Sequence, residues 1–140
     1  MSQECCSSGN QIMLLPCSGA SNVGQLANQA AVELSREGYG KMFCLAAIGA
    51  GLPNFVKSAQ TVPQLVAIDG CQVACTKHLL NKNDVPIGAY IVVQDLGIEK
   101  NTNTILDPAQ VEKVKDAVKN LGSQPCCNAS EQSAQTRCCG

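Results

Sequence analysis

Ten cysteines in a chain of 140 residues are the side chains best suited to specific chemistry. Four of them fall within or directly beside segments with regular apolar patterns: Cys17, Cys44, Cys71 and Cys75. The other six form adjacent pairs in polar stretches near the two ends of the chain: Cys5-Cys6, Cys126-Cys127 and Cys138-Cys139. Cysteine thiolates bind soft metal ions and act as nucleophiles, so their placement in the fold decides which chemistry is available.

The composition favours reduced, metal-binding cysteines over a disulfide framework. Hydrophobic residues make up 45% of the chain, the net charge is −1, and no basic or acidic block is present. We therefore expect one compact domain that binds neither nucleic acid nor membranes. The N-terminal stretch MSQECCSSGNQ lacks the basic and apolar regions of a signal peptide, so we expect a cytoplasmic protein whose cysteines stay reduced.

Short apolar runs alternate with helical patterns along the middle of the chain. The apolar runs predict four strands, at Ile12–Leu15, Met42–Ile48, Leu65–Ile68 and Ala89–Val93. Helical spacing follows each of them, over residues 23–34, from Pro53 onward, over residues 73–80 and over residues 108–122. The last helix carries the clearest start signal, because Asp107 can cap it and Pro108 can open it.

This alternation predicts an α/β fold with parallel strands and right-handed crossovers. We expect a three-layer, Rossmann-like domain with a four-stranded parallel sheet in the order 2-1-3-4 and helices on both faces. The domain spans residues 11–122. Residues 1–10 and 123–140 show no apolar periodicity and are interpreted as flexible tails, the second of them rich in Ser, Gln and Cys.

Four cysteines are predicted to meet at one edge of this sheet, because ligands bind outside the carboxyl ends of parallel strands. Cys17 follows the first strand and Cys71 follows the third, its neighbour in the order 2-1-3-4. Cys75 stands four residues after Cys71, so a helix starting there would place both thiols on one face. Cys44 lies on the predicted second strand. Four thiolates can close a tetrahedral zinc site with bonds of about 2.3 Å.

The type and order of these residues resemble those of one known protein family. The stretch Pro16-Cys17-Ser18-Gly19, then Cys44, and then Asp69-Gly70-Cys71 followed by Cys75 resemble the DGC-domain family, over roughly residues 12 to 95. That family is named for its central Asp-Gly-Cys, and its four cysteines are proposed as zinc chelators. The resemblance therefore implies a metal ion, with zinc as the expected cofactor, and leaves the cysteine pairs of the tails unexplained.

Several residues near this edge have more than one reading. A buried cysteine can simply be a small apolar side chain of the core, with no chemical role. This interpretation fits Cys44 best, because Cys44 lies inside an apolar run. His78 stands three residues after Cys75 and is either a substitute ligand or a solvent-facing side chain. Asp69 either orients a ligand or caps the following helix. A phosphatase-type loop would need arginine six residues after Cys17, where this chain has Val23.

Three functions remain open at this stage. The first is a metal-binding protein with one zinc held by Cys17, Cys44, Cys71 and Cys75. The second is a carrier of a soft metal or metalloid, such as Cu(I) or trivalent arsenic, or a thiol-redox protein, using the cysteine pairs of the tails. The third is an enzyme; the absence of paired carboxylates and of a cysteine–histidine couple at the strand ends weighs against it, without deciding the question. The metal, any protein partner and the oligomeric state are not specified by the sequence.

Overall fold

The computed structural model describes residues 11–122, which contain a four-stranded parallel sheet in the order β2-β1-β3-β4. The strands are β1 (Ile12–Pro16), β2 (Lys41–Met42), β3 (Gln64–Asp69) and β4 (Ala89–Val92). The longest pairing joins β1 to β3, from Ile12 opposite Gln64 to Pro16 opposite Ile68. The predicted α/β class, the parallel pairing and the strand order are confirmed. The predicted tails, including their cysteine pairs, lie outside the described residues.

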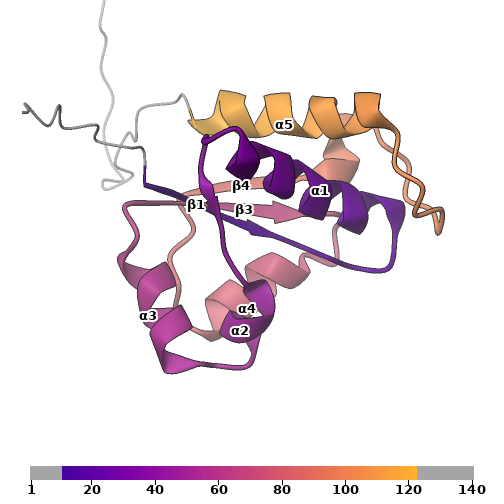
Figure 1. Ribbon diagram of the computed structural model, residues 1–140. Coiled ribbons are helices and arrows are strands. Elements are labelled where there is room, and N and C mark those ends of the chain that lie inside the picture. Colours follow the sequence, from indigo (N-terminus) through magenta and orange to yellow (C-terminus); the bar gives the residue numbers. More distant parts are fainter. Residues whose placement is uncertain (1–10, 123–140) are drawn as a thin grey trace, which may run out of the picture.

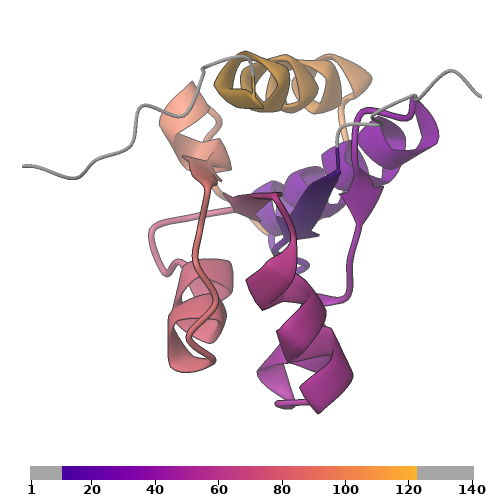
Figure 2. The same ribbon diagram turned by 90° about the vertical axis from the view of Figure 1, so that its left-hand side faces the viewer.

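Helices cover both faces of the sheet (Figure 1). On one face lie the two longest, α1 (Asn22–Arg36) and α5 (Pro108–Gly122). On the other lie α2 (Leu45–Gly49), α3 (Pro53–Thr61) and α4 (Cys75–Lys82), as the view along the sheet in Figure 2 also shows. A short 3-10 helix, η1 (Val93–Leu96), follows β4. Within residues 11–122, no helix is long and apolar enough to cross a membrane.

The core is built almost wholly from aliphatic side chains, in two clusters separated by the sheet. Under α1 and α5 the fully buried residues include Leu14, Leu26 and Val114. On the opposite face Leu15, Ile48 and Leu80 are fully buried. Burial of apolar surface on both faces explains why β1 and β3 read as continuous apolar runs in the sequence and not as alternating patterns.

The predicted second strand is wrong over most of its length. Only Lys41 and Met42 pair with β1, and the chain then leaves the sheet after Phe43, whose backbone N–H donates to the Leu14 carbonyl at 2.9 Å. Residues 45–49 form α2 instead. An apolar run of this length is compatible with either a strand or a buried helix, and Leu and Ala are good helix formers. Cys44 is therefore the residue that precedes a helix and not a strand residue.

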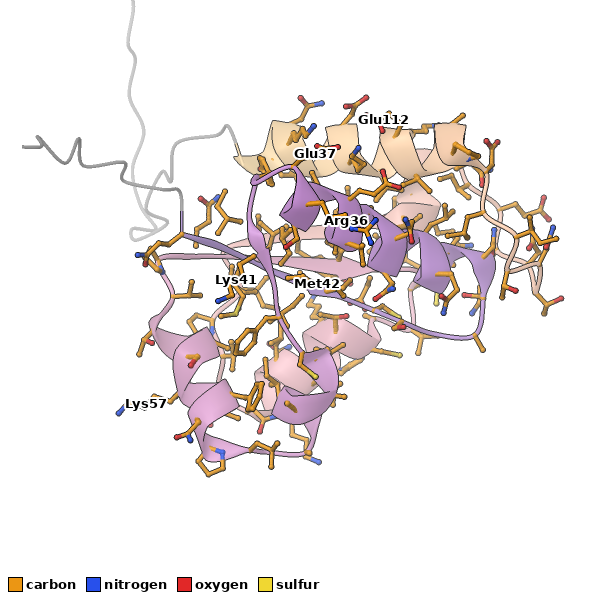
Figure 3. The ribbon with its side chains drawn as sticks, in the orientation of Figure 1. Arg36, Glu37, Lys41, Met42, Lys57 and Glu112 are labelled. Atoms are coloured by element: carbon orange, nitrogen blue, oxygen red, sulfur yellow. The ribbon has the colours of Figure 1, made fainter. Side chains whose placement is uncertain are left out.

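A buried lysine joins α1 to α5. The Lys115 side chain is only 5% exposed, and its Nζ forms ion pairs with Glu33 at 3.2 Å, with Glu112 at 2.9 Å and with Glu37. Lys119 pairs with Glu37 as well, at 3.0 Å. Figure 3 labels Glu37, at the end of α1, and Glu112, on α5. Burial of an unpaired ammonium group would be costly, and the three carboxylates offset that cost for Lys115.

This network predicts a specific acid sensitivity. Hydrogen bonds from Gln29 and Lys115 lower the pKa of the Glu33 carboxyl, and those from Lys115 and Lys119 lower the pKa of Glu37, below the ordinary value of 4.5. A carboxyl whose pKa is lower in the folded state stabilises the fold above the unfolded pKa. That stabilisation is lost as the pH falls through the folded pKa.

Lys115→Met should therefore lower the melting temperature at pH 7, by roughly 5 to 10 °C, because three carboxylates lose their shared cation. The variant should also lose less stability than the parent between pH 6 and pH 3, since its carboxyls no longer have the same lowered pKa. Thermal unfolding followed by circular dichroism at both pH values measures this. Lys113→Met, at an exposed position on the same helix, is the control. Parallel pH profiles for parent and Lys115→Met would contradict the assignment.

Candidate metal centre

Cys17 lies at the carboxyl edge of the sheet, directly after β1. Its backbone N–H donates to the carbonyl oxygen of Ile68 at 2.7 Å, which continues the pairing of β1 with β3 by one residue. Its side chain is half-buried, and its Sγ lies 3.5 Å from where a Cβ on Gly19 would stand. The strand register thus places the first predicted ligand beside the end of β3, as expected from the order of the strands.

Cys71 and Cys75 are joined by a turn and not by a helix. The Ala74 N–H donates to the Cys71 carbonyl at 3.0 Å, and Ala74 itself adopts a left-handed conformation with φ of 55°. α4 then begins at Cys75. The expectation that a helix starting at Cys71 puts both thiols on one helical face is therefore wrong. The turn nevertheless keeps both cysteines at the same strand end, with Cys71 half-buried and Cys75 exposed.

The thiols of Cys17, Cys71 and Cys75 share one electrostatic environment. Partial burial raises the pKa of the Cys75 thiol, and the negative charges of Cys17, Asp69 and Cys71 raise it further, in that order of size. These groups therefore lie within range of one another's electrostatic influence. Burial and these neighbours therefore make the thiolate form of Cys75 unfavourable unless a cation is bound beside it.

The turn between β3 and α4 is held by Asp69, which is only 1% exposed. Its carboxylate accepts the backbone N–H groups of Thr76 at 2.8 Å and Lys77 at 3.1 Å, so it caps α4. Tyr90 of β4 donates its hydroxyl to the same carboxylate at 3.0 Å. Burial and the neighbouring Asp69 charge raise the pKa of Tyr90, which keeps its phenol protonated as a donor. The capping role of Asp69, one of the two predicted alternatives, is the one that the structure shows.

A cation that the sequence did not reveal reaches the site from elsewhere in the chain. The Nζ of Lys100 lies 3.4 Å from the Cys71 Sγ, within hydrogen-bond range for sulfur. The segment that carries it is tied to α1, because Asn22 donates to the Glu99 carbonyl at 2.8 Å and accepts from the Asn101 N–H at 2.7 Å. No motif marks Lys100, since its position depends on contacts 77 to 79 residues apart in the chain.

Two further candidates stand apart from these thiols. Cys44 precedes α2 and is exposed, and it lines a cavity together with Pro16 and Ser18, the neighbours of Cys17. His78 is exposed on α4, which agrees with the solvent-facing interpretation. Within residues 11–122, no group of three or more His, Cys, Asp or Glu side chains converges tightly enough to hold a metal ion as placed. The ligand role of Cys44 and of the three clustered cysteines therefore stays a prediction.

Comparison with known proteins shows the family to which this chain belongs. The model of the DGC domain matches residues 13–118. The chain belongs to the DGC domain family. This DGC domain is also similar to the anaerobic and virulence modulator AnvM of Pseudomonas aeruginosa, with 30% identity over 102 residues that cover 73% of this chain and 78% of that protein. No solved structure matches the chain. The resemblance predicted from the cysteines and from Asp69-Gly70-Cys71 is thus confirmed.

Proposed function

We propose that this DGC domain binds one soft metal ion, zinc first among the candidates, through the thiolates of Cys17, Cys71 and Cys75, with Cys44 as the fourth ligand. The observation that carries the proposal is the placement of three cysteines after two adjacent strands, at the same edge of the sheet. Cys17 is placed by its backbone bond to Ile68, and the other two are placed by the capped turn after β3. Membership of the DGC domain family supports the same reading.

The donor set fits a thiolate-preferring ion. Sulfur ligands select zinc, Cu(I) and other soft ions over magnesium or calcium, which take oxygen ligands. Burial first, and then repulsion by neighbouring charges, raises the pKa of the Cys75 thiol, and a bound dication would favour its thiolate against both, so binding should release protons from the thiols. Lys100 beside Cys71 would offset part of the negative charge that a set of thiolates leaves on the bound ion. When bound, the ion would link the loop after β1 to the turn after β3.

The test measures the metal content of a variant that lacks the six cysteines of the tails. The parent for this test is the full chain with serine at positions 5, 6, 126, 127, 138 and 139, purified under reducing conditions without added metal. We expect about one zinc per chain by elemental analysis, and less than about a tenth of that after Cys17→Ser and Cys71→Ser are combined. Circular dichroism shows whether the double variant keeps its fold. Undiminished zinc in a folded double variant would overturn the assignment.

A single Cys44→Ser variant tests the fourth ligand separately. If Cys44 closes the site, the variant should still bind zinc but with an affinity lowered at least about tenfold, because three thiolates and a water replace four thiolates. Competition with a zinc-sensitive chelating dye measures this affinity. An unchanged affinity would show that the zinc is held without Cys44 and that its fourth position is open.

A further inference from the structure

An apolar cavity of about 320 Å³ lies next to Cys17, because the chain neighbours of Cys17, Pro16 and Ser18, are part of its wall. Its wall is formed by the end of β1, by α1, by the segment that leads into α2, and by α4, and it includes Pro16, Asn28, Phe43, Cys44, Ala46 and Leu79. Of the described thiols, that of Cys44 is the one in this wall. The proposed metal site uses nothing of this cavity except Cys44, so its apolar lining has no assigned role.

The cavity adjoins the thiols through their immediate neighbours. Pro16 and Ser18 flank Cys17 in the chain. Leu79 follows Cys75 by four residues within α4, so the two side chains lie on the same face of that helix, one turn apart. A ligand atom held by Cys17 and Cys75 would therefore lie next to an apolar space whose wall also contains Cys44.

We propose that this site accepts a soft metal or metalloid centre that carries one apolar organic group, such as trivalent arsenic bearing an aryl substituent. The thiolates of Cys17, Cys71 and Cys75 bind the arsenic, and the organic group occupies the cavity lined by Ala46 and Leu79. This proposal rests on the proposed function, because it needs the clustered thiols as ligands. Transfer of an aryl group from water into an apolar wall supplies affinity that an inorganic ion cannot obtain there.

The binding reaction exchanges oxygen for sulfur without a change of oxidation state. Phenylarsine oxide reacts with two thiols, so that two As–S bonds form, the arsenic–oxygen bonds break, and the two thiol protons leave in one water molecule. Inorganic arsenite, As(OH)3, reacts in the same way with three thiols and releases three water molecules. Both reactions require the thiols of Cys17, Cys71 and Cys75 to close around the arsenic, and the phenyl compound leaves one of them unused.

The experiment compares these two probes on the full chain with serine in place of the six tail cysteines. Affinities are measured by titration calorimetry and adduct masses by native mass spectrometry. Ala46→Phe narrows the cavity from an exposed position of α2 and leaves all four thiols in place. Ala50→Phe is the matched control, because Ala50 is also exposed at the end of α2 but is outside the cavity wall. Thermal unfolding verifies that both variants are folded.

We expect Ala46→Phe to weaken binding of phenylarsine oxide at least about tenfold, with arsenite affinity unchanged and Ala50→Phe without effect on either probe. Unchanged affinity for phenylarsine oxide in Ala46→Phe, with both probes still bound, would overturn the role of the cavity and leave the proposed function standing. An equal loss for both probes would also overturn it, because the substitution would then act on the thiols. If neither probe nor zinc binds the parent, the proposed function fails as well.

Discussion

Replacement of Gly70 by alanine should destabilise the domain by about 3 kcal/mol, because the new methyl group has no room. A Cβ at this position would stand 2.6 Å from the backbone nitrogen of Gly24, 2.8 Å from its Cα and 2.8 Å from the carbonyl carbon of Val23. These are backbone atoms in the first turn of α1, so they cannot rotate away as a side chain would. The turn after β3 and the start of α1 approach each other closely enough that only glycine fits.

Urea unfolding followed by circular dichroism measures the change in the free energy of unfolding. Gly19→Ala is the matched control from the neighbouring loop, since a Cβ there would meet only the Sγ of Cys17, at an ordinary contact distance of 3.5 Å. We expect the control to change stability by less than about 1 kcal/mol. A Gly70→Ala variant as stable as this control would show that the two loops separate at little cost.

The close contact of Gly70 with α1 also positions Cys71, one of the proposed metal ligands. Gly70 immediately precedes Cys71, and its carbonyl accepts the Gln94 N–H at 3.1 Å, so the residue is held from two sides. Moving it away from α1 would also move Cys71 away from Cys17. Where Gly70→Ala remains folded at low temperature, we expect any zinc affinity of the proposed site to fall together with the stability.

Asp69→Ala should cost about 2 to 4 kcal/mol of unfolding free energy, because one buried carboxylate satisfies three donors. Its removal leaves the backbone N–H groups of Thr76 and Lys77 uncapped and the Tyr90 hydroxyl without its acceptor. Loss of a cap alone costs about 1 kcal/mol, and the buried donors add to it. Urea unfolding again gives the free energy.

Asp95→Ala is the control for this substitution, because Asp95 is exposed and accepts one side-chain hydrogen bond, from Gln72 at 2.6 Å. We expect it to change stability by less than about 0.5 kcal/mol. If Asp69→Ala were as mild, the carboxylate would not be the group that holds the start of α4. An intermediate result is expected for Asp69→Asn, which keeps one acceptor oxygen and loses the charge.

Local patterns in the sequence determined the class of the fold and the edge of the sheet at which the proposed ligands Cys17, Cys71 and Cys75 lie. Continuous apolar runs marked β1, β3 and β4, and the spacing of Val111, Val114 and Val118 marked the buried face of α5. Parallel pairing and the strand order then placed Cys17 beside the end of β3. These features could be predicted because each depends on a periodicity within one segment or on a general rule of chain connection.

Tertiary contacts decided the remainder. The run from Met42 to Ile48 could form a strand or a helix, and packing of α2 under the sheet selected the helix over residues 45–49. Asp69 and the left-handed Ala74 set the start of α4 at Cys75, two residues after the start predicted from the apolar spacing. Lys100 reached Cys71 through hydrogen bonds between segments nearly 80 residues apart. Pairings between segments so distant in sequence leave no local periodicity, so only the folded chain could place the cation and the apolar cavity beside the thiols.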